Sequence, residues 1–109
     1  MALKHALPLE VMDIRPLGQS LAAAVSSSLL KTPTLQLMRL VLQAGKQLPE
    51  HHVAGEISVQ CLEGDAVVST PQRSINLAAG HVVVLPAGEP HAVLAVTDTS
   101  LLVTVLLQP

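Results

Sequence analysis

The sequence contains no aromatic residue: its 109 positions include no Phe, Tyr or Trp. Proteins that bind single-stranded nucleic acids usually stack the bases on aromatic rings. The six Lys and Arg residues are scattered singly, and the formal net charge is -2, so the chain has no basic patch to neutralise phosphates. These two absences exclude nucleic acid from the expected partners.

Cysteine and long hydrophobic runs are almost as scarce. The one cysteine, Cys61, cannot form an internal disulfide bond and supplies no thiolate cluster for zinc. This usage fits a reducing compartment, and we expect a cytoplasmic protein. Charged residues and Pro8 interrupt the N-terminus before a signal-peptide core forms, and no run approaches the ~18 apolar residues of a membrane helix. We therefore expect no membrane span.

Apolar residues are abundant instead. They make up 50% of the chain, whereas charged residues make up 13%, and the mean hydropathy is +0.52. A chain of this length fits one domain and can bury roughly two-thirds of the surface that its unfolded form exposes. Because the apolar content exceeds what one such core can hide, we expect a homodimer in which a second copy covers the rest.

Val, Leu and Ile occur in short runs that turn residues separate, a pattern typical of all-β folds. In the clearest run, residues 34–45, both alternating faces are apolar, so we expect a strand that is covered on both sides. A hairpin turn is expected at residues 63–65, and a second tight turn at Pro71 and Gln72. From residue 34 onward we expect seven strands and no helix. The predicted fold class is an all-β, antiparallel barrel of six to eight strands.

The N-terminal segment, residues 1–33, is expected to be strand and loop within the same domain as the barrel of residues 34–109. Residues 18–27 are ambiguous, because a run of alanines favours a helix and the serines that follow weaken it. We expect a loop or short turn there, and then a strand near residues 28–32.

The stretch GHVVVLPAGEPH, residues 80–91, carries a recognisable pattern. The residues that stand at the positions of the second signature motif of the cupin superfamily are Gly80, Pro86, Gly88 and His91. Ala95 replaces the asparagine that ends this motif. The glycines permit tight turns and the prolines restrict the chain, so His91 opens a new strand at a stiffened position.

The stretch GKQLPEHHVAGEISVQCLEG resembles the first cupin motif. Its matching residues are Gly45, His51 and Gly64. Val53 and Ile57 occupy two positions at which the family carries metal ligands. The resemblance covers residues 34–107 and implies a small single-domain, RmlC-like cupin: a jelly-roll barrel, closed at one end, with a small pocket. Closure would also remove exposed sheet edges.

The histidines offer two interpretations. Side chains alternate across a strand, so His52 points away if His51 points inward, unless a bulge that Gly55 favours re-aims them. With such a bulge, a divalent metal ion (Fe, Mn, Ni, Zn or Cu) would have four ligands: His51, His52, Glu56 and His91. Without it, His51 and His91 remain in the barrel as polar residues, and His52 and Glu56 lie on the surface.

Two further residues are candidates for ligand binding beside His51 and His91. Cys61 should share the inward face with Val59, where it packs as a small hydrophobe or lies close to His51. Arg39, a charge on an apolar strand, could bind an anionic ligand at the barrel mouth, form an ion pair or extend to solvent. No catalytic residue is assigned.

We expect a cupin that binds a small aliphatic or polar molecule in its pocket, with or without a metal ion, between His51 and His91. One alternative is a metal-dependent enzyme similar to the dioxygenases or isomerases of the superfamily. Another is a structural or partner-binding dimer without a ligand, which would follow if side chains filled the pocket. Fold alone does not decide among the three.

Overall fold

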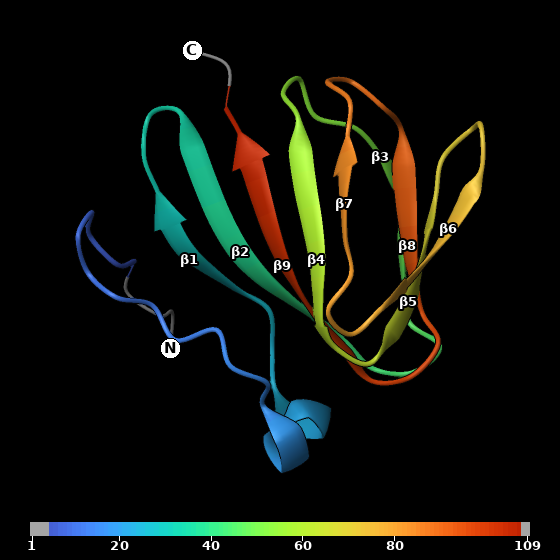
Figure 1. Ribbon diagram of the computed structural model, residues 1–109, viewed down its shortest axis with the longest axis horizontal. Coiled ribbons are helices and arrows are strands. Elements are labelled where there is room, and N and C mark those ends of the chain that lie inside the picture. The colour runs from blue at the N-terminus through green and yellow to red at the C-terminus, as the bar shows by residue number, and fades with distance from the viewer. Residues whose placement is uncertain (1–4, 108–109) are drawn as a thin grey trace.

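The computed structural model describes residues 5–107, and β-strands dominate this part of the chain (Figure 1). Its elements are a short 3-10 helix, η1 (Gly18–Ala23), and the strands β1 (Ser27–Lys31), β2 (Leu35–Leu42), β3 (Gln47–His51), β4 (Ile57–Glu63), β5 (Asp65–Ser69), β6 (Ser74–Ala78), β7 (Val82–Leu85), β8 (His91–Ala95) and β9 (Thr99–Leu106). None of the described helical residues forms a segment long and apolar enough to cross a membrane.

The strands form two antiparallel sheets. The five-stranded sheet has the order β1-β2-β9-β4-β7, and the four-stranded sheet has the order β3-β8-β5-β6. Each sheet buries one face against the other, and the central strands supply alternating apolar residues to that face. The predicted all-β class and the jelly-roll arrangement are confirmed.

The expected closure of the barrel is wrong for the described residues. No hydrogen-bonded ladder joins the two sheets, so β1 and β7 remain edges of one sheet, and β3 and β6 remain edges of the other. Strand β7 pairs only with β4 and spans just Val82–Leu85. Edge β3 contains Pro49, which lacks an N–H and so suits an edge.

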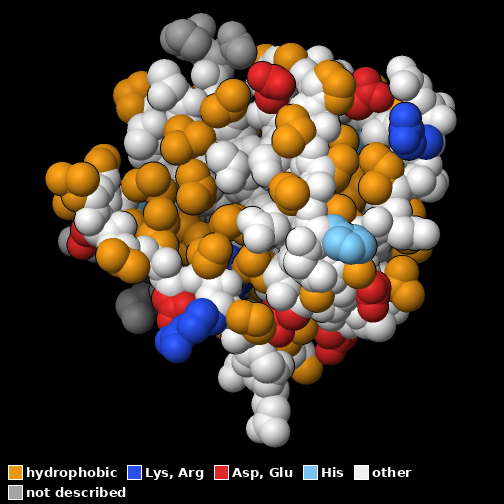
Figure 2. Space-filling view, in the orientation of Figure 1, with side chains coloured by type: hydrophobic (Ala, Val, Ile, Leu, Met, Phe, Trp, Pro, Cys, Tyr) orange, Lys and Arg blue, Asp and Glu red, His pale blue; other side chains and the backbone are white. Residues whose placement is uncertain are grey.

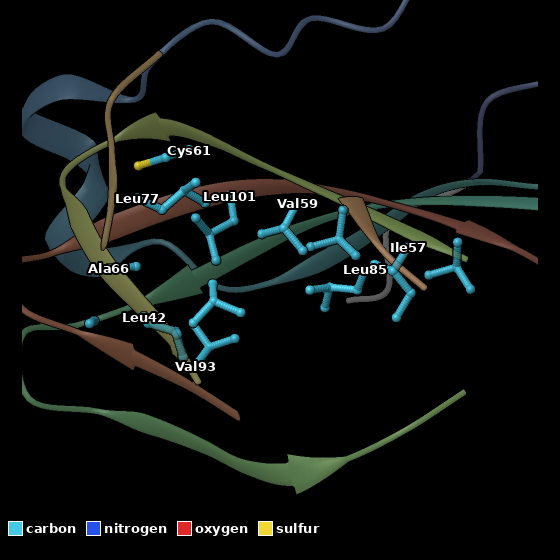
Figure 3. Close-up of a cluster of buried hydrophobic side chains, with 13 residues drawn as sticks. Leu42, Ile57, Val59, Cys61, Ala66, Leu77, Leu85, Val93 and Leu101 are labelled. Carbon is cyan, nitrogen blue, oxygen red and sulfur yellow. The ribbon is translucent and has the colours of Figure 1, made fainter. Parts of the chain in front are cut away.

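The core lies between the sheets, and β4 shows how the sequence builds it. Ile57, Val59 and Cys61 are all buried, and the residues between them are only partly buried. Figure 3 shows the buried side chains extending from the Cys61 end of the molecule to the Ile57 end. Leu101 on β9 is 0% exposed, and complete burial of such a side chain contributes about 1.5–3 kcal/mol to stability.

Two sequence-based predictions about strands are wrong. Residues 63–65 do form a turn, but β4 and β5 are not a hairpin, because the chain passes there from one sheet to the other. Strand β3 was not expected, and it makes eight strands from residue 34 onward rather than seven. The turn at Pro71 and Gln72 is confirmed, because β5 and β6 pair on either side of it.

The N-terminal segment contributes to the five-stranded sheet and covers part of its outer face. Strand β1 lies close to the predicted position and pairs with β2. Residues 18–27, whose structure was ambiguous, contain η1 and then an irregular stretch. Before η1, the N–H groups of Leu17 and Gly18 donate to the Glu63 carboxylate at 2.7 and 3.1 Å, which fixes the segment to the end of β4.

Candidate functional site

His51 and His91 lie side by side at one end of the space between the sheets. His51 ends β3, His91 begins β8, and the two residues are direct cross-strand partners. Their ring centroids are 4.3 Å apart, with an angle of 58° between the ring planes. The structure therefore brings together the two imidazoles that the motif spacing singled out.

A bulge in β3 allows this pairing. Leu48 is opposite Val93 and His51 is opposite His91, so three steps along β3 match two steps along β8. The extra residue changes which side chains face inward. We expected a bulge after His51, and the structure places the irregularity just before it. His91 is 4% exposed, whereas His51 lies exposed at the end of its strand.

Both rings are oriented by the backbone of their own chain segment. His51 Nδ1 lies 3.0 Å from the Pro49 carbonyl oxygen, and His91 Nδ1 lies 3.0 Å from the Glu89 carbonyl oxygen. A carbonyl oxygen can only accept, so Nδ1 of each ring carries the hydrogen and donates it. Each neutral ring therefore keeps the lone pair of Nε2 for another group.

The turn before His91 connects the two motifs. Gly88 has φ 77°, a left-handed conformation that favours glycine, which agrees with the tight turn expected there. The Gly88 N–H donates to the Val53 carbonyl oxygen at 3.0 Å. This hydrogen bond holds the segment after His51 against the segment before His91, so the two histidines are positioned together.

A cavity of about 80 Å³ lies beside the pair. Apart from the two histidines, its walls are aliphatic side chains and one methionine, Met38. Val53 and Ile57, which occupy two ligand positions of the family, are among the aliphatic residues. The cavity thus combines an apolar body with two imidazole nitrogens at one place on its wall.

The other proposed metal ligands lie elsewhere. His52 is exposed and does not line the cavity. Glu56 is also exposed, and it lines a hollow on the outer face of the five-stranded sheet together with Ser58 and Thr104. Within residues 5–107, no group of three or more His, Cys, Asp or Glu residues is placed to hold one ion. The bulge brings neither His52 nor Glu56 to the histidine pair.

Cys61 and Arg39 do not line this cavity either. Cys61 is completely buried in the core, where its thiol lies 3.4 Å from the Glu63 carbonyl oxygen. It lies at the opposite end of β4 from Ile57. Arg39 faces outward from β2, beneath the N-terminal segment, rather than toward the barrel mouth.

Cys61 is expected to be an unreactive thiol in the folded protein. Burial raises the pKa of the Cys61 thiol; the hydrogen bond to the Glu63 backbone opposes this shift, and the negative charges of Asp65 and Glu63 add to it. Since only the thiolate reacts with iodoacetamide and the side chain is buried, alkylation at about pH 8 should be slower in the native protein than in denaturant. Equal rates in the two states would contradict the buried, neutral thiol.

The same shift predicts a loss of stability at alkaline pH. A pKa that is raised in the folded state adds stability below the ordinary thiol pKa of about 8.5, and that stability is lost as the pH rises above it. Denaturant titrations of the parent and of Cys61→Ala across this range measure the difference. The stability of the variant should vary less with pH than that of the parent.

Comparisons by sequence alone identify no relative of this chain. No protein-family model matches it, and no curated protein matches it.

Solved structures resemble it closely in fold. A conserved protein of unknown function from Streptococcus pyogenes has a TM-score of 0.76 and 24% identity, over 100% of this chain and 96% of its own. An RmlC-like cupin from Desulfovibrio desulfuricans has a TM-score of 0.69 and 28% identity, over 97% of both chains. A predicted oxalate decarboxylase from Thermotoga maritima has a TM-score of 0.68 and 23% identity, over 76% of this chain and 79% of its own.

Proposed function

We propose that this protein, whose fold is that of the small single-domain cupins, binds a small, mainly aliphatic molecule with one polar end in the cavity between its sheets. The observation that carries the proposal is the pair of imidazoles, 4.3 Å apart, on the wall of an otherwise aliphatic cavity. Apolar walls with a few convergent polar groups are typical of small-molecule sites.

The size of the cavity limits the ligand. Its volume of about 80 Å³ is roughly half that of the ~150 Å³ engineered cavity that binds benzene. A molecule of about three to five non-hydrogen atoms therefore fits without rearrangement. At the upper limit of about 1.5 kcal/mol per atom, four atoms give about 6 kcal/mol, a Kd on the order of tens of micromolar at best.

The polar end of the ligand is recognised by Nε2 of His51 and His91. Both Nδ1 atoms are committed to backbone carbonyl groups, so Nε2 is the atom that remains on each ring. As a neutral ring it accepts a hydrogen bond from an alcohol, an amide or a protonated acid, and as a charged ring it donates to a carboxylate. The partly open position of His51 gives the polar end access to solvent.

A metal ion does not fit the described residues well. Catalytic zinc sites use about three protein ligands, and the histidine pair supplies two nitrogens. Val53 and Ile57 line the cavity and cannot coordinate a metal. We therefore assign ligand binding to the imidazoles themselves, and we expect it to survive dialysis of the protein against a chelator.

The two alternative functions receive less support. The metal-dependent enzyme, whether similar to a dioxygenase or to an isomerase, requires a ligand set that residues 5–107 do not assemble. The fold shared with a predicted oxalate decarboxylase does not by itself carry that chemistry. A structural role without a ligand requires a filled interior, whereas the cavity beside the histidines has a volume of about 80 Å³.

A series of ligands of increasing length tests the proposal. We expect straight-chain alcohols, amides and carboxylic acids to raise the melting temperature, with the largest effect at about four or five non-hydrogen atoms and a smaller one beyond, because longer chains exceed the cavity. Saturation at 100 times Kd should add about 2.7 kcal/mol of stability. Calorimetry measures Kd for each member, and an affinity that rises steadily to the longest chains would refute binding in this cavity.

The homodimer expected from the composition stays a prediction. Val82, Val84 and Leu106, on the outer face of the five-stranded sheet, are 58%, 59% and 44% exposed, and Figure 2 shows hydrophobic side chains gathered over β1, β2 and β9. Light scattering after gel filtration should give twice the chain mass of 11.4 kDa. The mass of one chain at every concentration would contradict the prediction.

A further inference from the structure

Arg39 is a buried cation on the outer face of the five-stranded sheet. It lies on β2, on the same face of the strand as Leu37 and Val41, and its direct partner on β9 is Leu102. Its neighbours in the chain, Met38 and Leu40, line the barrel cavity. Because side chains alternate across a strand, Arg39 points to the opposite face. It is nevertheless only 8% exposed.

The burial of Arg39 comes from the N-terminal segment, residues 13–23, which we call the strap. Arg39 Nη2 donates to the Arg15 carbonyl oxygen at 2.8 Å. The Glu63 carboxylate accepts hydrogen bonds from the N–H groups that begin η1, and Leu21 is buried. The strap is therefore attached at several points, and the guanidinium lies beneath it.

Two polar atoms on this covered face have no hydrogen-bond partner among the described residues: Arg39 Nε and Ser100 Oγ. Ser100 is the β9 partner of Val41, so it is a diagonal neighbour of Arg39 on the same face of the sheet. A buried polar group without a partner is costly, and a buried guanidinium is more so. The face beneath the strap thus has unused hydrogen-bonding capacity.

Arg39 forms no ion pair with the described carboxylates. Asp13 is engaged by Arg15, with a shortest distance of 2.8 Å, and this pairing, with a smaller contribution from the charge of Arg39, lowers the pKa of Asp13 to about 2. Glu63 is engaged by the strap. Within residues 5–107, the Asp13–Arg15 pair is the only ion pair that meets a 4.0 Å limit. An unpaired buried charge favours an anionic partner.

A surface cavity of about 320 Å³ lies beside the guanidinium. Its lining consists of Asp13, Arg15, Pro16, Leu17 and Arg39. The lining carries two positive charges and one negative charge, which favours a singly charged anion over a multiply charged one. Pro16 and Leu17 add apolar wall for an organic group. The guanidinium fork matches the two oxygens of a carboxylate.

We propose that Arg39 and the strap form a binding site for a small organic carboxylate, separate from the barrel cavity. The carboxylate pairs with the part of the Arg39 guanidinium that lines the cavity and neutralises its charge, and its organic part lies against Pro16 and Leu17. The site does not depend on the function proposed for the histidine pair. Arg39 faces outward from the five-stranded sheet, whereas the histidines belong to the four-stranded sheet and line the cavity between the sheets.

The test uses the full chain and sodium acetate at constant ionic strength, with sodium chloride as the reference salt. The chain has three arginines, so three Nε–H signals are expected in an NMR spectrum, and Arg39→Lys identifies that of Arg39. We expect acetate to shift this signal with saturation, and the Arg73 signal to stay in place. Equal shifts with chloride, or no shift, would overturn the proposal.

Variants separate this site from others. Arg39→Met keeps the aliphatic stem and should abolish the rise in melting temperature that acetate produces in the parent. Its own melting temperature in chloride is the baseline, because it loses both the hydrogen bond to Arg15 and an unpaired buried charge. Arg39→Lys should weaken acetate binding by at least about tenfold, since it loses the fork. His91→Leu should retain the acetate-induced shift of Arg39 Nε. If His91→Leu lost that shift, the independence of the two sites would be refuted.

Two further outcomes decide the class of anion. Asp13→Asn removes a negative charge from the lining and should strengthen acetate binding. Inorganic phosphate, tested in parallel, should bind the parent more weakly than acetate because its second charge meets Asp13. If phosphate shifted the Arg39 Nε signal and acetate did not, the carboxylate assignment would be refuted.

Discussion

His91→Leu is expected to reduce the affinity of the best short-chain ligand by a factor of about 10 to 100, the cost of removing one hydrogen bond in an apolar cavity. His91 is almost completely buried and contacts His51 directly. Leucine fills a similar space without a nitrogen, so the loss reports recognition of the polar end. Calorimetry on the parent and the variant measures the two values of Kd.

Two comparisons make this result specific. His81→Leu changes an exposed histidine that does not line the cavity, and its Kd should equal that of the parent. His51→Leu should weaken binding in the same direction as His91→Leu. If His91→Leu bound the ligand as tightly as the parent while its circular dichroism stayed native, His91 would not be the polar anchor.

Gly55→Ala is expected to destabilise the fold by about 3 kcal/mol or more, because overpacking against backbone costs about 1–3 kcal/mol and occasionally more. A Cβ at this position would overlap the carbonyl oxygen of Leu106. The carbonyl oxygen and the carbonyl carbon of Leu106 that the Cβ would meet are backbone atoms of β9. Relief of the overlap therefore requires β9 or the segment after His51 to move. Urea titration of the parent and the variant gives the difference in free energy of unfolding.

Gly80→Ala is the matched control for this substitution. Gly80 has φ 88°, and a Cβ there would meet nothing within 4 Å. Its cost is therefore conformational only, about 1–2 kcal/mol. If Gly55→Ala proved no more harmful than Gly80→Ala, the close approach of Gly55 to β9 would be contradicted. Loss of the histidine pairing in Gly55→Ala is also expected, since Gly55 lies in the segment between His51 and β4.

The sequence predicted the strand positions well where apolar and polar residues alternate. Strand β4 is the clearest case, because its buried residues are the alternate ones. Strand β3 was missed because only Leu48 among its five residues is partly buried, the others being exposed, and it contains a proline. An edge strand with one ladder needs little apolar surface, so periodicity does not reveal it.

The pairing of strands was harder to predict than their existence. The turn around Gly64 has the composition of a hairpin loop, yet it carries the chain from one sheet to the other. A Cβ at Gly64 would overlap the Asp98 carbonyl oxygen, so contact with the loop before β9 requires glycine there. That reason depends on a distant segment, and turn chemistry alone cannot supply it.

The candidate site was predictable in part. The spacing of the two motifs singled out His51 and His91, which the structure places in contact. The orientation of Arg39 could not be predicted. Both faces of its strand are apolar, so the alternation of side chains along the strand does not say which face is inward. The same limit applies to His52 and Glu56, whose directions depend on where a bulge falls.

The central claim is that His51 and His91 together hold the polar end of a small molecule. The most direct measurement is an NMR titration of the imidazole signals of all five histidines with the best short-chain ligand. We predict that His51 and His91 shift together with one Kd, while the described His5, His52 and His81 stay in place. A response of His5, His52 and His81 alone, or no response from His51 and His91, would contradict the claim.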